Sequence, residues 1–179
     1  MPLPPDVLDD RARKLRMLLF DVDGVFSDGS VVVGSDGTES KAFFVRDGAA
    51  VIWARRAGLT VGLLSGRTSG ATTRRAAELG IGLVEQGHLD KRSAYERICE
   101  DAGLTDEQVA YMGDDMLDLP VIARVGLSAA PADAVPDVLS RVDWVSHRPG
   151  GRGAVRDFVE LVLRARGRWD SLVDEHLAM

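Results

Sequence analysis

Three short apolar runs, each followed at once by polar side chains, most constrain how this 179-residue chain folds. The runs and their polar followers are 15–20 with Asp21, 59–64 with Ser65, and 109–112 with Gly113 and Asp114. Segments with helical spacing separate the runs. Buried strands that alternate with helices indicate an α/β fold, a Rossmann-like doubly wound parallel sheet. Because such sheets bind ligands beyond the carboxyl ends of their strands, we expect the polar side chains to meet in one site.

Residues 28–45 predict a β-hairpin inserted after the first strand. β-forming residues at 31–33 and 42–45 flank Gly34-Ser35-Asp36-Gly37, a turn sequence. The remaining pattern predicts two short strands, at 82–84 and 126–128. It also predicts one helix that follows the second buried strand and ends at Leu79, and further helices at 48–57, 91–102, 116–124, 152–166 and 168–178. We interpret residues 1–179 as one domain, with a partly ordered N-terminal lead-in at 1–13 and a C-terminal tail at 167–179.

The composition excludes several classes of protein. A net charge of −6 and a pI near 5.1 disfavour a nucleic-acid partner, which usually needs a basic face. A single cysteine excludes an internal disulfide framework and a Cys-based zinc site. No apolar run approaches the ~18 residues of a membrane helix, and the start lacks the apolar stretch of a signal peptide. We therefore expect a cytoplasmic protein that binds no membrane.

The segment Asp21-Val22-Asp23-Gly24 places two carboxylates at the end of the first strand. Asp21 could attack a phosphoryl group and form an aspartyl-phosphate. Asp23 could protonate the leaving alcohol and later deprotonate water. A glycine-containing turn with solvated aspartates fits the same four residues equally well, so this motif alone does not decide between the two.

Two further segments could hold a phosphate. Ser65, Gly66 and the neighbouring amides follow the second strand, and the guanidinium of Arg67 suits anionic oxygens. Lys91 stands at a helix start, where the dipole disfavours a cation unless an anion holds it there. Taken alone, Ser65 also fits a helix N-cap, and Lys91 also fits an exposed surface position.

Asp114, Asp115 and Asp118 follow the third buried strand. A group of carboxylates is the ligand set that Mg²⁺ prefers, and the ion would offset repulsion between Asp21 and a phosphate. Helix N-capping explains one of the three aspartates but not all of them.

The order of these motifs, each at the end of an expected element, resembles the haloacid dehalogenase (HAD) superfamily of phosphohydrolases from about residue 15 to residue 166. More narrowly, several segments resemble the 3-deoxy-D-manno-octulosonate 8-phosphate phosphatase family. They are the hairpin and residues 21–29, 44–48, 85–87, 111–115 and 150–156. The resemblance implies a capless HAD-like fold in which a homotetramer closes the site. It also implies Mg²⁺-dependent hydrolysis of a sugar acid phosphate in lipopolysaccharide biosynthesis, through an aspartyl-phosphate.

The resemblance also assigns roles to residues. It makes Asp21 the nucleophile and a metal ligand, and Asp23 the general acid/base and a metal ligand through its carbonyl. Asp114 completes the metal ligands, and Ser65 and Lys91 hold the phosphoryl group. Asp115 and Asp118 orient the metal, a water molecule and Lys91. Positions that contact substrate in the family correspond to Asp23, Arg46, Asp47, Gly48, Gly66, Arg67, Arg75 and Lys91. Arg156 could meet the substrate carboxylate, across a subunit boundary, and Arg152 is equally available.

One segment departs from the family pattern and keeps other substrates open. Ala49, Ala50 and Ile52 stand where the family shows a bulky residue, a glycine and a basic residue. A nonulosonate 9-phosphate or another small sugar phosphate is therefore the alternative substrate. Two other hypotheses are a non-catalytic phospho-acceptor domain, which would lack Asp23 and the hairpin, and an assembly subunit with a vestigial site.

Overall fold

The computed structural model describes residues 3–178, so the ends of the predicted lead-in (1–2) and tail (179) lie outside it. The strands are β1 (Met17–Phe20), β2 (Val32–Val33), β3 (Glu39–Ser40), β4 (Thr60–Leu64), β5 (Leu83–Glu85), β6 (Val109–Met112), β7 (Leu127–Ala130) and β8 (Trp144–Val145). The α-helices are α1 (Pro5–Lys14), α2 (Val45–Arg56), α3 (Gly70–Glu78), α4 (Lys91–Ala102), α5 (Leu119–Ile122), α6 (Pro136–Leu139), α7 (Ala154–Ala165) and α8 (Trp169–Leu177). Two 3₁₀ turns, η1 (Asp106–Gln108) and η2 (Met116–Asp118), complete the elements of this part of the chain.

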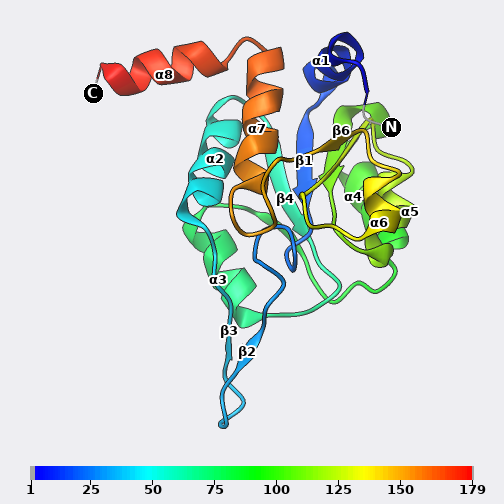
Figure 1. The fold of residues 1–179 in the computed structure, drawn as a ribbon, viewed down its shortest axis with the longest axis vertical. Coiled ribbons are helices and arrows are strands. Elements are labelled where there is room, and N and C mark those ends of the chain that lie inside the picture. Colours follow the sequence, from blue (N-terminus) through cyan, green and yellow to red (C-terminus); the bar gives the residue numbers. More distant parts are fainter. Residues whose placement is uncertain (1–2, 179) are drawn as a thin grey trace.

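Within the described residues, the main sheet is parallel and has the strand order β5-β4-β1-β6-β7-β8. Its central strands β4, β1 and β6 lie side by side in Figure 1. The first strand is central, because β1 pairs with β4 on one side and with β6 on the other. The chain adds β4 and β5 outward from β1, then crosses to add β6 on the opposite side. The strand order therefore reverses beside β1, and at such a reversal the carboxyl ends of the strands leave a crevice for a ligand.

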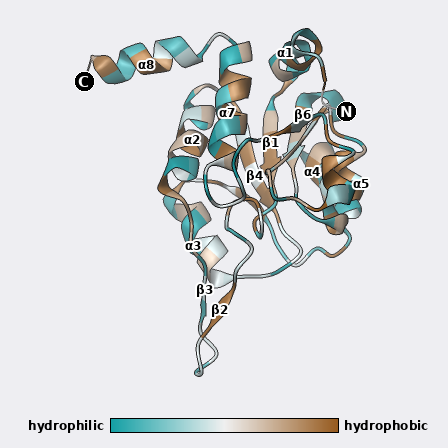
Figure 2. Cartoon of the chain, viewed as in Figure 1, coloured by the Kyte–Doolittle hydropathy of each residue, from teal (hydrophilic) through white to brown (hydrophobic). Residues whose placement is uncertain are grey.

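Helices cover both faces of the sheet, as the alternation of strands and helices predicts. Leu18 and Phe20 of β1 belong to the core shared with α1, α2, α3 and α7, whereas Met17 and Leu19 belong to the core shared with α4, α5 and α6. Successive side chains of a strand point to opposite faces, which is why one apolar run serves both cores. Figure 2 shows the hydrophobic strands enclosed between helices whose outer faces are hydrophilic.

The hairpin projects from the body of the molecule as a two-stranded ribbon (Figure 1). Its turn lies where the sequence predicts it, but the predicted second strand at 42–45 is wrong, because β3 ends at Ser40 and α2 begins at Val45. Phe43 packs edge-on against Phe26 of the body, with ring centroids 6.4 Å apart. The apolar run after the turn therefore anchors the hairpin to the core.

Other elements differ from the sequence prediction mainly at short segments. The expected lead-in is the ordered helix α1, which buries Leu8 and Ala12. The short elements α6 and β8 are not predicted, and the helix expected over 116–124 is divided into η2 and α5. Within residues 3–178, no helix combines the length and the apolar character needed to cross a membrane.

Candidate active site

A buried cation lies among carboxylates at the carboxyl end of the central strands. Lys91, the first residue of α4, has its Nζ 2.9 Å from Asp21 Oδ1 and 2.5 Å from Asp118 Oδ1. The Lys91 side chain is only 2% exposed. The Tyr111 hydroxyl, at the end of β6, donates to the same Asp118 oxygen over 2.6 Å. Asp21 and Asp118 thus supply the negative charge beside Lys91 at this helix start, and Lys91 is not the exposed surface lysine that the sequence also allowed.

Asp118 orients the loop that follows β6. Its Oδ2 accepts hydrogen bonds from the backbone amides of Asp114 (2.8 Å) and Asp115 (3.1 Å). Both Asp118 oxygens are thus occupied by protein donors. Asp115 is more exposed and caps η2, where its carboxylate accepts from the Met116 amide.

The site contains a group of carboxylates that fits a metal ion. Oxygen atoms of Asp21, Asp114 and Asp118 lie within 4.8 Å of one another. Asp114 Oδ1 is buried without a hydrogen-bond partner. A Cβ atom at Gly24 would lie 2.0 Å from Asp114 Oδ2, so only glycine there leaves room for this carboxylate. Because protein donors already occupy both Asp118 oxygens, Asp21 and Asp114 are the members of this group whose side chains could bind a metal ion.

The electrostatics of the cluster agree with a cation site. Burial, with the Asp118 carboxylate, raises the pKa of Asp21 to about 7. Burial and the Asp21 carboxylate raise the pKa of Asp114 to about 8. Burial lowers the pKa of Lys91, but Asp21 and Asp118 outweigh this and raise it overall. Carboxylates with raised pKa values are stabilised in their ionised form by a nearby cation, and hard oxygen ligands select Mg²⁺ or a similar ion.

We expect the Mg²⁺-induced rise in Tm to be larger at about pH 8 than at about pH 6. The pKa values of Asp21 and Asp114 in the folded chain lie above the unfolded value of about 4. Their contribution to stability without metal is therefore lost as the pH rises from about 4 to about 8. Magnesium competes with the bound protons, so its stabilisation grows as the carboxylates ionise.

Thermal unfolding with and without MgCl₂ at both pH values measures this effect. The Asp114→Asn variant is the control, because it lacks a proposed ligand and should show a smaller Mg²⁺ increment. An increment in the parent that does not change with pH would contradict the assignment of these carboxylates as ligands.

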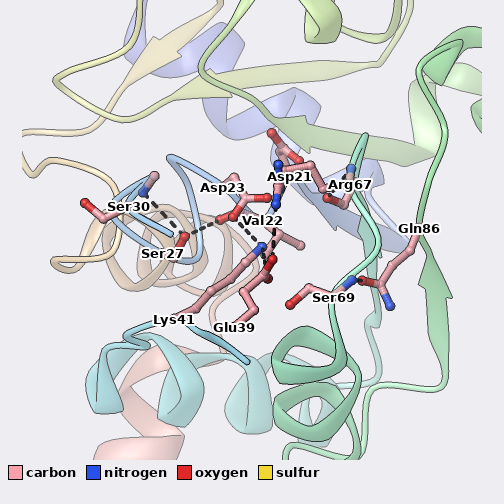
Figure 3. A network of polar contacts seen from close by, with 12 residues as sticks. Asp21, Val22, Asp23, Ser27, Ser30, Glu39, Lys41, Arg67, Ser69 and Gln86 are labelled. Atoms are coloured by element: carbon pink, nitrogen blue, oxygen red, sulfur yellow. Dashed lines mark hydrogen bonds and ion pairs between the residues drawn. The ribbon is translucent and has the colours of Figure 1, made fainter. Parts of the chain in front are cut away.

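Ser65 and Arg67 lie in the loop after β4, the neighbour of β1. The buried Ser65 Oγ accepts from the Arg67 amide over 3.3 Å. Arg67 Nη2 donates to Glu39 Oε2 of the hairpin over 3.1 Å (Figure 3). Asp23 faces the hairpin too, because Lys41 Nζ lies 2.6 Å from Asp23 Oδ1. Sequence reasoning missed Glu39, Lys41 and Tyr111. Lys41 had one available signal, since it is one of only three lysines in the chain.

Asp47 and Gly48, in the first turn of α2, connect this helix to α7 and α3. Asp47 is fully buried, and its two oxygens accept from the amides of Gly153 (3.2 Å) and Arg156 (2.8 Å) at the start of α7. Burial raises the pKa of Asp47 to about 6. A Cβ atom at Gly48 would lie 2.3 Å from Arg75 Nη2, so the glycine admits Arg75 beside α2. The structure thus brings Gly48 and Arg75 together but directs the Asp47 carboxylate to α7 and not to the acidic cluster.

The remaining predicted arginines, Arg46, Arg152 and Arg156, have different surroundings. Arg46 is exposed and stacks on Phe44, with its guanidinium carbon 5.9 Å from the ring centroid. The Arg156 guanidinium carbon lies 4.3 Å from the Trp53 ring centroid. Arg152 is 64% exposed and lies 3.6 Å from Asp28. Arg156 is therefore engaged with aromatic rings of its own chain, whereas the Arg152 side chain is mostly exposed despite its ion pair with Asp28.

The glycine-rich loop before α7 packs on the loop after β1. A Cβ atom at Gly150 would lie 1.7 Å from the Gly24 carbonyl oxygen. We expect Gly150→Ala to lower the free energy of unfolding by roughly 2–4 kcal/mol, because backbone must move to relieve this overlap. Chemical denaturation measures the loss, with Gly82→Ala as the control, since nothing lies within 4 Å of a Cβ there. Equal stability of the two variants would contradict the close approach.

Known proteins are similar to this chain in sequence and in fold. The sequence model of the haloacid dehalogenase-like hydrolases matches residues 70–155. The 3-deoxy-D-manno-octulosonate 8-phosphate phosphatase KdsC of Salmonella typhimurium is 43% identical over 169 residues, 94% of this chain and 89% of that protein. This chain belongs to the 3-deoxy-D-manno-octulosonate 8-phosphate phosphatase family. Like its family, it is a phosphoric monoester hydrolase of the HAD superfamily.

Two solved structures of this phosphatase family bear on the metal. The Moraxella catarrhalis enzyme, in complex with magnesium, phosphate and the KDO molecule, is 32% identical with a TM-score of 0.93, covering 94% of this chain and 97% of that one. The cobalt-bound Haemophilus influenzae enzyme is 40% identical with a TM-score of 0.86, covering 89% and 93%. Both share the fold of this chain, whose acidic cluster is of the kind that could hold such an ion.

Proposed function

We propose that this phosphatase hydrolyses 3-deoxy-D-manno-octulosonate 8-phosphate with Mg²⁺ through an aspartyl-phosphate on Asp21. The observation that carries the proposal is the cluster of Asp21, Asp114 and Lys91 at the carboxyl end of the central strands, where Lys91 Nζ lies 2.9 Å from Asp21. The 43% identity to a named phosphatase over 94% of the chain supports the substrate. The magnesium-bound relative supports the metal.

The proposed reaction has two steps. An Asp21 oxygen attacks phosphorus, the bond from phosphorus to the sugar oxygen breaks, and Asp23 gives its proton to the leaving alkoxide. A water molecule then attacks the phosphorus and gives a proton to Asp23, and the bond between phosphorus and Asp21 breaks to release inorganic phosphate. Lys91 and the Ser65 hydroxyl bind the phosphoryl oxygens. Asp21, Asp114 and the Asp23 carbonyl would hold Mg²⁺, which would supply charge neutralisation at the phosphoryl group.

A panel of phosphate esters tests the substrate. We expect kcat/KM for 3-deoxy-D-manno-octulosonate 8-phosphate to exceed that for simple sugar phosphates by at least about tenfold, which corresponds to about 1.4 kcal/mol of selective binding. A nonulosonate 9-phosphate is the most informative competitor. Ile52, where the family shows a basic residue, is partly buried against the core and supplies no cation to a sugar-acid pocket. A higher kcat/KM for the nonulosonate 9-phosphate would make that ester the proposed substrate. Equal, low kcat/KM values over the whole panel would contradict both proposed substrates.

We also propose that the enzyme is a homotetramer in which the hairpin of one copy covers the site of another. The hairpin projects from the body, and its strand β2 is hydrophobic (Figures 1 and 2). The β2 residues Val32 and Val33 are 65% and 68% exposed. Exposed apolar strand edges favour association with another chain. Of the two arginines near α7, we assign contact with a neighbouring site to Arg152, because Arg156 stacks on Trp53. A monomeric mass in light scattering would contradict the proposal.

A further inference from the structure

A buried lysine at the base of the hairpin contacts the proposed general acid/base. Lys41 directly follows β3, yet its side chain is 0% exposed. Its Nζ lies 2.6 Å from Asp23 Oδ1 and 3.9 Å from Glu39 Oε1 (Figure 3). A buried ammonium is costly unless anions surround it, so these two carboxylates account for its position.

The contact occupies one oxygen of the Asp23 carboxylate and leaves the other without a hydrogen-bond partner. Oδ1 accepts from Lys41, while Oδ2 is buried without a hydrogen-bond partner. A side chain that transfers protons in both half-reactions needs one fixed orientation and one available oxygen. An aspartate with no partner would sample several rotamers and lose this geometry.

A chain of alternating charges fixes Lys41 in turn. Glu39 lies between Lys41 and Arg67, whose Nη2 donates to Glu39 Oε2 over 3.1 Å. The Arg67 amide then donates to the hydroxyl of Ser65. The base of the hairpin is thus tied to two of the three loops that form the site, those after β1 and β4.

The geometry points to Lys41 as a positioning residue that holds the Asp23 carboxylate for proton transfer to the leaving group. This inference rests on the proposed role of Asp23. A different role, in which Lys41 only anchors the hairpin, predicts the same rate loss for every substrate. A positioning role predicts a loss that depends on how much the leaving group needs a proton.

Two esters separate these roles in the Lys41→Met variant. An alkyl phosphate that the parent cleaves expels an alkoxide that needs a proton, whereas p-nitrophenyl phosphate expels a phenolate that leaves without one. We expect the single-turnover rate of ester cleavage to fall at least about tenfold for the alkyl ester and by less than about threefold for the aryl ester. KM should stay within about twofold, and Lys41→Arg, which keeps the charge, should recover part of the alkyl rate.

Two controls keep the inference open to refutation. Lys14→Met removes an exposed lysine of α1 and should leave both rates unchanged. In an Asp23→Asn background, adding Lys41→Met should cost less than about twofold, because Lys41 would act through Asp23. Equal losses on the two esters, no loss on either, or full additivity with Asp23→Asn would each overturn the inference. The activity of the parent on the sugar-acid phosphate tests the proposed function separately.

Discussion

Replacing Asp21 by Asn is expected to lower kcat at least about a thousandfold while the fold is retained. The amide has no anionic oxygen to attack phosphorus, so the aspartyl-phosphate cannot form. The fold should persist because the substitution preserves side-chain volume and removes a carboxylate whose pKa burial raises to about 7. Phosphate release from any ester that the parent cleaves measures the activity, and circular dichroism with the Tm measures the fold.

Asp115→Asn is the matched control for this variant. The Asp115 carboxylate caps η2 from a more exposed position and is not part of the group formed by Asp21, Asp114 and Asp118. We expect it to change kcat by less than about tenfold. Parent-level activity in Asp21→Asn would contradict the mechanism, and an equal loss in both variants would show that charge alone, and not a nucleophile at position 21, supports turnover.

The location of the site could be predicted because it follows from backbone topology. Short apolar runs followed by Asp21, Ser65 and Asp114 are local features, and parallel strands bring their carboxyl ends to one edge. The pairing of β1 with both β4 and β6 confirms that these three positions are neighbours. The location of the site thus depends on backbone topology and not on individual side-chain contacts.

The contacts that complete the site depend on segments that are far apart in sequence. Asp47 accepts from the Gly153 amide across 106 positions, and this link exists only because α2 packs on α7. From its local sequence, Lys41 resembles a solvated lysine of a β-hairpin, and only the tertiary fold brings it against Asp23. Tyr111 likewise resembles an ordinary core aromatic residue, and only the structure shows that its hydroxyl donates a hydrogen bond to Asp118. Local patterns carry no information about such pairings, which tertiary packing decides.

Replacing Lys91 by Met should have the second large effect, on both stability and activity. The variant leaves the Asp21 and Asp118 carboxylates buried together without the cation that lies 2.9 Å and 2.5 Å from them. Removing one partner of a buried ion pair costs about 3–5 kcal/mol, because the remaining charge stays desolvated. We expect a comparable fall in the free energy of unfolding measured in urea. We expect kcat to fall at least about a hundredfold, because the ammonium that would bind the phosphoryl oxygens is lost.

The pH dependence and a double variant distinguish this electrostatic cause from a packing defect. Burial raises the pKa of Asp21 to about 7, and its protonation removes one of the unpaired charges, so the stability lost in Lys91→Met should shrink as the pH falls from about 8 towards about 5. Adding Asp118→Asn removes one of the two charges and should restore part of the stability. It should not restore activity, because the phosphoryl oxygens still lack the Lys91 ammonium. A loss of stability that is independent of pH, or a double variant less stable than Lys91→Met, would show that the packing of the lysine stem and not its charge holds this site together.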